Sequence, residues 1–215
     1  MFSRSVDVLV ADLATVDVDE DQLSVAELGR ALGIASPAML RQYLAAHTWL
    51  RERLSDYLDV PGSEITFEER EHGKPVIAVP YTDLSFNLSY ANDLAVLALG
   101  FRMDVGVDVV SLEGAKVNPE MIHRVLSRPE ADSVLSAPDM RKEFYKLFVR
   151  REAMAKAHGG GDIQSNPGFN VLGLSPVSRD GLEVTDVNLG EGFAAAVAVP
   201  VGCSIELTAL VGAAA

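Results

Sequence analysis

Two acidic residues, Asp108 and Glu152, lie in segments that are otherwise largely apolar. Asp108 lies in MDVGVDVV, residues 103–110, whose alternating apolar residues predict a strand, and Glu152 lies in FVRREAMAKA, residues 148–157, whose spacing predicts a helix. Burying a carboxylate on an apolar strand face costs several kcal/mol unless it is paired, hydrogen-bonded or metal-bound. We therefore expect a specific partner for Asp108; the alternatives are a partly exposed strand face or backbone hydrogen bonds at the strand end.

The helix that contains Glu152 also carries cations. Arg151 falls at the centre of an apolar stripe, where it must reach a buried anion or water along a cleft. Glu152 and Lys156 form an i,i+4 pair at the edge of this stripe, which as a plain surface ion pair would contribute only a few tenths of a kcal/mol. The stripe consists of Phe144, Leu147, Phe148, Met154 and Ala155.

Carboxylates beside cations are typical of sites that act on phosphate. Carboxylates that leave coordination positions to water and phosphate oxygens suit Mg²⁺, and nearby Lys and Arg side chains suit the rest of a phosphate chain. The glycines at 159–161 follow the helix and leave backbone N–H groups accessible to an anion, although a glycine at a helix end is common on its own. Together these residues predict phosphoryl chemistry on a substrate that contains a pyrophosphate.

The composition limits the classes of partner. The chain has 215 residues, 48% of them hydrophobic, enough for one large domain or two small ones. A formal charge of −13 argues against nucleic acid, because binding its phosphates requires Lys and Arg. No apolar run approaches the roughly 20 residues of a membrane span, and the single cysteine, Cys203, allows no intrachain disulfide. We expect a cytoplasmic protein that binds neither nucleic acid nor membrane.

The charges are distributed unevenly along the chain. Seven acidic residues fall within the first 27, whereas Lys and Arg gather between residues 124 and 156. One interpretation of the second segment is a basic surface for an acidic partner, and the other is an ordinary solvated helix face.

Two apolar hairpins suggest an internal duplication. The segments FNLSYANDLAVLALGF, residues 86–101, and VNLGEGFAAAVAVP, residues 187–200, align with one gap and place Asn87 and Asn188 about 100 positions apart. Chance similarity between two common hairpins is the alternative. If the duplication is real, the two halves share one architecture.

We predict an α+β fold, a pseudo-dimer of two similar lobes, each an antiparallel sheet with packed helices. Residues 1–104 form the N-terminal lobe and residues 105–215 the C-terminal lobe. In the first lobe, Ser36 followed by Pro37 predicts the start of a long helix. A cleft between related lobes is a preferred place for a small-molecule site, so we expect the ligand there.

Four short motifs together resemble the 4'-phosphopantetheinyl transferases. The segments GVDVV, residues 106–110, and FVRREAMAK, residues 148–156, are similar to the two signatures of this family. The preceding HGKP, residues 72–75, and FNLSY, residues 86–90, are similar to motifs of its two-lobed, surfactin-synthetase-activating type. The resemblance covers about residues 40 to 200.

The resemblance implies the reaction. The family transfers the 4'-phosphopantetheine group of coenzyme A to a serine of an acyl, polyketide or peptidyl carrier protein, with Mg²⁺, and releases adenosine 3',5'-bisphosphate. Asp108 and Glu152 would be the magnesium ligands, and Lys156 would contact the pyrophosphate. Glu130 matches a further acidic position, which makes it a candidate for deprotonating the carrier serine. The implied catalytic residues are thus Asp108, Glu152, Lys156 and Glu130.

The resemblance also implies contacts to coenzyme A. Gly73, Lys74 and Pro75 would border the adenine, and Ser89 and Tyr90 would lie near the ribose 3'-phosphate. Helix residues of the family reach coenzyme phosphates where this chain has Arg51 and His47. The predicted coenzyme-binding set is Arg51, Gly73, Lys74, Pro75, Ser89, Tyr90, Asp108, Arg151 and Lys156.

Four positions depart from the family pattern. Tyr90 replaces a usual His, Val110 replaces a frequent carboxylate, Arg151 replaces Lys, and Phe148 replaces a frequent Trp. These departures leave open a catalytically weak or inactive coenzyme A-binding homologue with a regulatory role. A third hypothesis is a structural α+β protein whose buried charges only pair with one another. Because two lobes in one chain supply the cleft, we expect a monomer.

Overall fold

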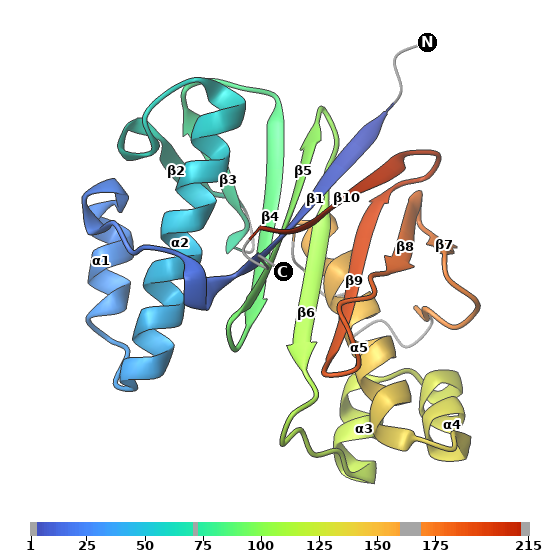
Figure 1. The fold of residues 1–215 in the computed structure, drawn as a ribbon. Helices are drawn as coiled ribbons and strands as arrows, with labels where there is room; N and C mark the ends of the chain where they lie inside the picture. Colours follow the sequence, from blue (N-terminus) through green and yellow to red (C-terminus); the bar gives the residue numbers. More distant parts are fainter. Residues whose placement is uncertain (1–3, 71–72, 160–168, 212–215) are drawn as a thin grey trace.

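The computed structural model describes residues 4–70, 73–159 and 169–211, which form three sheets flanked by helices (Figure 1). The first sheet has the order β10–β1–β5–β4, the second has the order β6–β9–β8–β7, and the third pairs β2 with β3. The strands are β1 (Ser5–Asp12), β2 (Thr66–Glu69), β3 (Pro75–Val79), β4 (Leu84–Ala91), β5 (Leu94–Phe101), β6 (Gly106–Ser111), β7 (Val177–Arg179), β8 (Leu182–Asp186), β9 (Phe193–Pro200) and β10 (Ser204–Val211).

Helices cover the outer faces of the two large sheets. The predicted long helix begins as expected, with Ser36 as the N-cap and Pro37 in the first turn, and runs to Leu58. The α-helices are α1 (Val25–Ala31), α2 (Pro37–Leu58), α3 (Pro119–Val125), α4 (Arg128–Ser136) and α5 (Met140–Ala157), and the 3-10 turns are η1 (Leu13–Thr15), η2 (Glu20–Gln22) and η3 (Gly62–Glu64). Within the described residues, no helix is long and apolar enough to cross a membrane.

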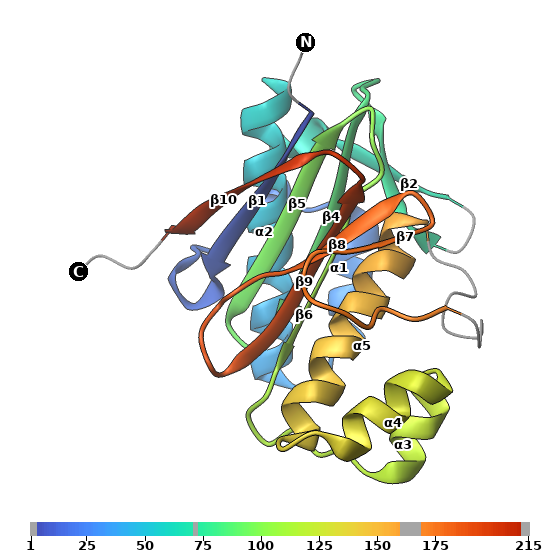
Figure 2. The ribbon, with the colours of Figure 1, turned by 90° about the vertical axis from the view of Figure 1, so that its right-hand side faces the viewer.

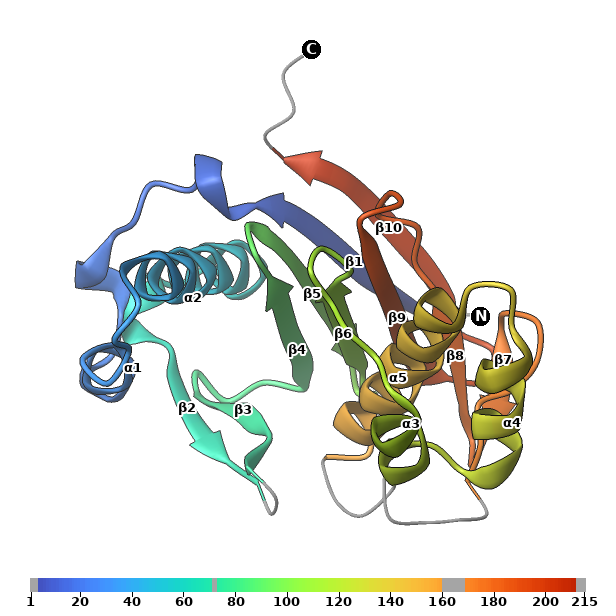
Figure 3. The ribbon, with the colours of Figure 1, turned by 90° about the horizontal axis from the view of Figure 1, so that it is seen from below.

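The two large sheets pack face to face, with α2 outside the first and α5 outside the second (Figure 3). Alternate residues of each strand point into different cores, as strand geometry requires. Val8 and Val107 lie in the core between the sheets, Leu97 faces α2, and Ala196 faces α5. The predicted α+β fold of two packed lobes is therefore confirmed.

One strand departs from the antiparallel expectation. The chain leaves β9, crosses back to the first sheet, and adds β10 parallel to β1, with Ser5 opposite Ser204 (Figure 2). The first sheet is thus built from both ends of the described chain. The lobe division at residues 104 and 105 stays a prediction.

The hairpins predicted from the repeat are present, but their register differs. Asn87 lies within β4, whereas Asn188 lies in the loop between β8 and β9 and accepts a hydrogen bond from the backbone N–H of Gly190 at 3.1 Å. The reason is loop length: a tight turn at residues 92–93 joins β4 to β5, while residues 187–192 separate β8 from β9. The predicted equivalence of these two asparagines was wrong.

Side chains of β4 hydrogen-bond to the backbone of β6, although these two strands belong to different sheets. The Oδ1 atom of Asn87 accepts a hydrogen bond from the backbone N–H of Val107 at 2.8 Å, and the Oγ atom of Ser89 accepts one from the N–H of Val109 at 3.2 Å. Both acceptors are buried. These two bonds fix β6 against β4 and satisfy backbone donors that would otherwise be buried without partners.

A glycine sets the separation between β6 and α5. A Cβ atom at Gly106 would lie 2.1 Å from the carbonyl oxygen of Ala153 and 2.4 Å from the backbone nitrogen of Ala157. Only glycine permits this approach of strand and helix.

Gly106→Ala should therefore destabilise the fold, because the helix backbone must move outward. We expect a loss of about 3 kcal/mol in the free energy of unfolding, measured by urea denaturation. Gly29→Ala is the matched control, since Gly29 lies inside α1 with open space around it, and it should stabilise by up to about 1 kcal/mol. Equal unfolding free energies for the two variants would contradict the close contact.

Candidate active site

The helix α5 runs antiparallel to β6, which brings its residues level with those of the strand. The Nζ atom of Lys74 donates to the carbonyl oxygens of both Val105 and Ala157. At the other end, Arg141 donates to the carbonyl oxygen of Leu112 at 3.1 Å. From Val105 to Leu112 the strand is about 23 Å long, and from Arg141 to Ala157 the helix is about 24 Å long. Asp108 is about 10 Å along the strand from Val105, so it lies level with the middle of the helix, near residue 150.

Asp108 has the specific partners expected for a buried carboxylate. Its Oδ1 atom lies 2.6 Å from the Nζ atom of Lys156 and accepts a hydrogen bond from the Oγ atom of Ser89 at 3.0 Å. Lys156 also donates to Ser89 and to the carbonyl oxygen of Val107. Glu152 is half-buried one helical turn before Lys156, on the same side of α5. The strand and helix signatures therefore meet at the contact between Asp108 and Lys156, and the shared metal ion of Asp108 and Glu152 stays a prediction.

A cavity of about 350 Å³ opens beside Lys156. Its volume lies within the range of small-molecule sites, about 300–1,000 Å³. Its walls come from α2, the turn before β3, β4 and α5, and five residues of the predicted coenzyme set line it. The lining residues are His47, Leu50, Gly73, Lys74, Pro75, Phe86, Asn87, Leu88, Tyr90 and Lys156.

Burial shifts the pKa values of two cavity residues, Lys74 and Tyr90. Burial lowers the pKa of Lys74, an effect that the nearby carboxylate of Asp104 opposes. Burial raises the pKa of Tyr90, so its hydroxyl keeps its proton at neutral pH and can donate a hydrogen bond into the cavity. The cavity thus presents both cationic and neutral donors.

The donor set fits magnesium. Asp108 and Glu152 offer carboxylate oxygens, and Mg²⁺ is usually held by one or two carboxylates together with water and substrate phosphates. Across residues 4–70, 73–159 and 169–211, no group of three or more His, Cys, Asp and Glu side chains could hold a metal ion.

Ser89 and Tyr90 face opposite sides of β4. Ser89 contacts Asp108 on β6, whereas Tyr90 lines the cavity and packs toward the core under α2. We expected both side chains near one phosphate, and a strand cannot place consecutive side chains on one face. Ser89 instead orients Asp108.

Arg151 and Glu130 form a buried ion pair away from this site. Both side chains are almost completely buried, with the Nη1 atom of Arg151 3.0 Å from the Oε2 atom of Glu130. Glu130 also caps α4 through Ser127 and accepts the backbone N–H of Val171. Both side chains thus have structural partners, and the catalytic role of Glu130 and the coenzyme contact of Arg151 stay predictions. Arg151 is five positions from Lys156, about 140° around the helix, so both cannot face one ligand.

Arg51 has the same arrangement in the first lobe. Its guanidinium is buried and donates to both carboxylate oxygens of Glu27 and to the carbonyl oxygens of Gly62 and Ile65. Arg51 is thus bonded to protein acceptors and does not line the cavity, and its contact with a coenzyme phosphate stays a prediction. That contact is implied by the family resemblance, which does not name Glu27 as the partner of Arg51.

These two arginines mark the duplication better than the hairpins do. Each lies on a long helix, pairs with the third residue of a helix that a serine caps, and stacks over a phenylalanine ring. The matching residues are Arg51, Glu27 and Phe67 in the first lobe, and Arg151, Glu130 and Phe169 in the second.

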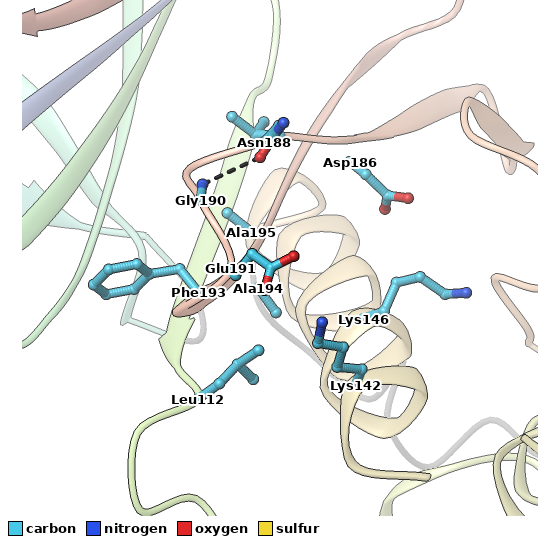
Figure 4. A pocket seen from close by; sticks show the side chains of 11 residues that line it. Leu112, Lys142, Lys146, Asp186, Asn188, Gly190, Glu191, Phe193, Ala194 and Ala195 are labelled. Atoms are coloured by element: carbon cyan, nitrogen blue, oxygen red, sulfur yellow. Dashed lines mark hydrogen bonds between the residues drawn. The ribbon is translucent and has the colours of Figure 1, made fainter. Parts of the chain in front are cut away.

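Two further features lie apart from the cavity. Gly159 follows the end of α5 with φ +89°, but residues 160 and 161 of the glycine run lie outside the described residues. A larger cavity of about 540 Å³ lies between the first turns of α5 and the β8–β9 loop, with Lys142 and Lys146 on one side and Glu191 on the other (Figure 4). None of the predicted coenzyme residues lines this second cavity, so we place the candidate site at the smaller one.

Comparison with known proteins finds a family similarity in the second half of the chain. Residues 104–199 match the model of the 4'-phosphopantetheinyl transferase superfamily. The chain is 30% identical over 143 residues to the 4'-phosphopantetheinyl transferase HetI of a Nostoc strain, covering 65% of this chain and 60% of that one. The resemblance drawn from the motifs is confirmed.

Two other relatives match this chain over a smaller share of their own length. The L-aminoadipate-semialdehyde dehydrogenase-phosphopantetheinyl transferase of Homo sapiens is 30% identical over 153 residues, 64% of this chain and 48% of that one. The 4'-phosphopantetheinyl transferase gsp of Aneurinibacillus migulanus is 27% identical over 119 residues, 52% of this chain and 46% of that one. The matches therefore span between about half and three-fifths of these curated relatives.

Removing one partner of the Arg151–Glu130 pair should destabilise the fold more than replacing both. Glu130→Leu alone leaves a buried cation without its carboxylate and should cost about 3–5 kcal/mol, measured by thermal unfolding. The double variant with Arg151→Met should recover part of this loss. Asp132→Asn, on the exposed side of α4, is the control. A fully additive double variant would show that the two side chains do not interact.

The ionisation of Glu27 should make stability depend on pH. Burial alone would raise its pKa, but hydrogen bonds from His47, Arg51 and Ser24 together hold the pKa far below the ordinary value of 4.5. A lowered pKa stabilises the fold above the pKa of the unfolded chain, and this contribution is lost as the pH falls below it. The difference in unfolding free energy between the unaltered chain and Glu27→Gln should therefore shrink between pH 7 and pH 3.

A matched exposed carboxylate separates this effect from general acid unfolding. Glu64→Gln, at the exposed end of η3, should leave the unfolding free energy nearly unchanged across the same range. A Glu27→Gln difference that stays constant with pH would contradict the ionised pair.

Proposed function

Because residues 104–199 match the model of the 4'-phosphopantetheinyl transferase superfamily, we propose that the chain transfers 4'-phosphopantetheine from coenzyme A to a serine of a carrier protein. The observation that carries this proposal is the position of Lys156. It lines a cavity of suitable size, contacts Asp108, and lies one turn from Glu152. A lysine in the wall of a ligand-sized space thus contacts one carboxylate and lies one helical turn from another.

The cavity residues would bind and orient coenzyme A. Lys156 suits the pyrophosphate, and the turn that contains Gly73, Lys74 and Pro75 offers a wall for the adenine. Mg²⁺ held by Asp108 and Glu152 would supply charge neutralisation of the pyrophosphate. Ser89 keeps the Asp108 carboxylate in position through its hydrogen bond.

The transfer exchanges one phosphorus–oxygen bond for another. The hydroxyl oxygen of the carrier serine attacks the β-phosphorus of coenzyme A, and the bond to the oxygen of the adenosine 5'-phosphate breaks. Adenosine 3',5'-bisphosphate leaves with the bonding electron pair, and water takes up the serine proton. Lys156 stabilises the charge that develops on the leaving phosphate, because an ammonium fixed near that oxygen need not reorganise.

The carrier protein would approach the end of the molecule where α3, α4 and the start of α5 lie together (Figure 1). Exposed cations in this region suit an acidic helical partner, and the cavity of Figure 4 opens beside Lys142. Arg150 does not contribute, because it is buried against Asp186. The exposed cations are Arg124, Arg128, Arg141 and Lys142. The monomeric state and cytoplasmic location stay predictions.

Loss of either carboxylate should abolish most of the activity. Asp108→Asn and Glu152→Gln should each slow modification of an apo carrier protein about 100-fold or more, since charge stabilisation of the transferred phosphate is lost. The measurement is the mass increase of intact carrier protein supplied with coenzyme A and Mg²⁺. Asp180→Asn, in the exposed turn between β7 and β8, is the control for removal of a carboxylate from the same half and should modify carriers at the unaltered rate.

The same assay separates the competing functions. If no carrier in a panel is modified although coenzyme A binds, the catalytically silent, regulatory coenzyme A-binding homologue becomes the better hypothesis. If coenzyme A does not bind at all, both hypotheses fail and only a structural α+β protein remains.

A further inference from the structure

Lys74, in the turn before β3, bridges the two elements that carry the site residues. Its Nζ atom donates to the carbonyl oxygen of Val105 at 3.1 Å and to the carbonyl oxygen of Ala157 at 3.3 Å. Val105 directly precedes β6, the strand that contains Asp108, and Ala157 is the last residue of α5 and follows Lys156. One side chain of the first lobe thus joins the strand and the helix of the second.

The contact with Ala157 caps the C-terminal end of α5. The carbonyl oxygen of the last residue of a helix lacks an intrahelical donor, and this end of a helix carries a partial negative charge. An ammonium group there donates a hydrogen bond and neutralises the charge. Lys74 therefore stabilises the last turn of α5, the turn that contains Lys156, where helices otherwise fray.

The bridge lies beside the close approach of β6 to α5. Gly106 directly follows Val105, and because it has no Cβ atom, the backbone of α5 comes near it at Ala153 and Ala157. A glycine permits this approach but has no side chain that maintains it. Lys74 bonds to the backbone on both sides and supplies that connection.

Exposure distinguishes the ammonium group of Lys74 from that of Lys156, although both have protein acceptors and both residues line the cavity. The Lys74 side chain is 5% exposed, and the carboxylate of Asp104 lies 3.7 Å from its Nζ atom in addition to the two carbonyl oxygens. The Lys156 side chain is 30% exposed. The more exposed ammonium group is the one that a phosphate can reach, so Lys156 suits the substrate and Lys74 suits the protein.

We propose that Lys74 is a positioning residue: it connects the end of α5 to the start of β6 and so keeps Lys156 within hydrogen-bond distance of Asp108. Lys74 thus acts on the transfer through Lys156, and its own ammonium group does not contact coenzyme A. The inference rests on the proposed function, because Lys156 stabilises a leaving phosphate only if coenzyme A occupies this cavity.

Lys74→Met tests this role, since it removes both hydrogen bonds and keeps an unbranched side chain of similar length. It should lower kcat for carrier modification about tenfold, because a small displacement of Lys156 removes charge stabilisation from the transition state. A raised KM for coenzyme A with an unaltered kcat, the result of losing a ground-state contact, would overturn the proposal. Arg70→Met is the matched control: it removes an exposed cation that also pairs with Asp104 and should change neither constant.

A double-variant cycle with Lys156→Met tests whether Lys74 acts through Lys156. If it does, adding Lys74→Met to Lys156→Met should neither lower kcat further nor weaken the affinity for coenzyme A, measured by titration calorimetry. Additive losses in an enzyme that modifies carriers would overturn this inference alone. If the unaltered chain neither binds coenzyme A nor modifies a carrier, the proposed function fails as well.

The ammonium groups can also be observed by NMR in the unaltered chain, which keeps the proposal testable if Lys74→Met does not fold. Coenzyme A should change the ammonium signal of Lys156 more than that of Lys74, and the reverse order would contradict the proposal. If Lys74→Met folds, the ammonium hydrogens of Lys156 should exchange with water faster than in the unaltered chain. The signals can be assigned by substitution, because the lysines are Lys74, Lys116, Lys142, Lys146 and Lys156.

Discussion

The arrangement of the site depends on two side chains of β4 that bond to the backbone of β6. Asn87 and Ser89 replace the missing ladder between the two sheets, and both bonds end on buried N–H groups. Because Ser89 also bonds Asp108, the contact that joins the lobes is the contact that orients the site carboxylate. Gly106 then admits α5 closely enough for Lys156 to reach the same carboxylate. The lobe seam and the candidate active site are therefore one hydrogen-bonded unit.

The buried ion pairs outside the site connect helices within each lobe. In each lobe an arginine of the long helix neutralises the glutamate of a capping box, and the pair ties a short helix to the lobe. Such pairs are weak contributors to stability when complete, but removal of one member leaves a charge without compensation. In the first lobe the glutamate has acquired another neighbour, His47, at the cavity wall. Residue 147, at the corresponding place on α5, is leucine and belongs to the core.

Much of the fold and the centre of the site could be predicted from local patterns. Ser36 with Pro37 specifies a helix start, alternation specifies β6, and the i,i+4 spacing of Glu152 and Lys156 specifies a shared face. For Arg51, Arg151 and Glu130 the family resemblance implies functional contacts but does not name the buried partners that these side chains have in the fold. Each partner is a capping-box glutamate, readable as Ser-x-x-Glu at residues 24–27 and 127–130, but the pairing arises only in three dimensions. The asparagine register failed because loop lengths differ between the two hairpins.

The parallel pairing of β10 with β1 has a consequence for biosynthesis. A chain leaving the ribosome presents β1, β4, β5 and α2 long before residues 204–211 emerge, so the first sheet must wait with one side of β1 lacking its neighbour. All strands of the second sheet, β6 to β9, are synthesised before β10. The N-terminal sheet is thus completed only after the strands of the second sheet have been made, and an exposed edge beside β1 is the point at which a chaperone or a second nascent chain could compete.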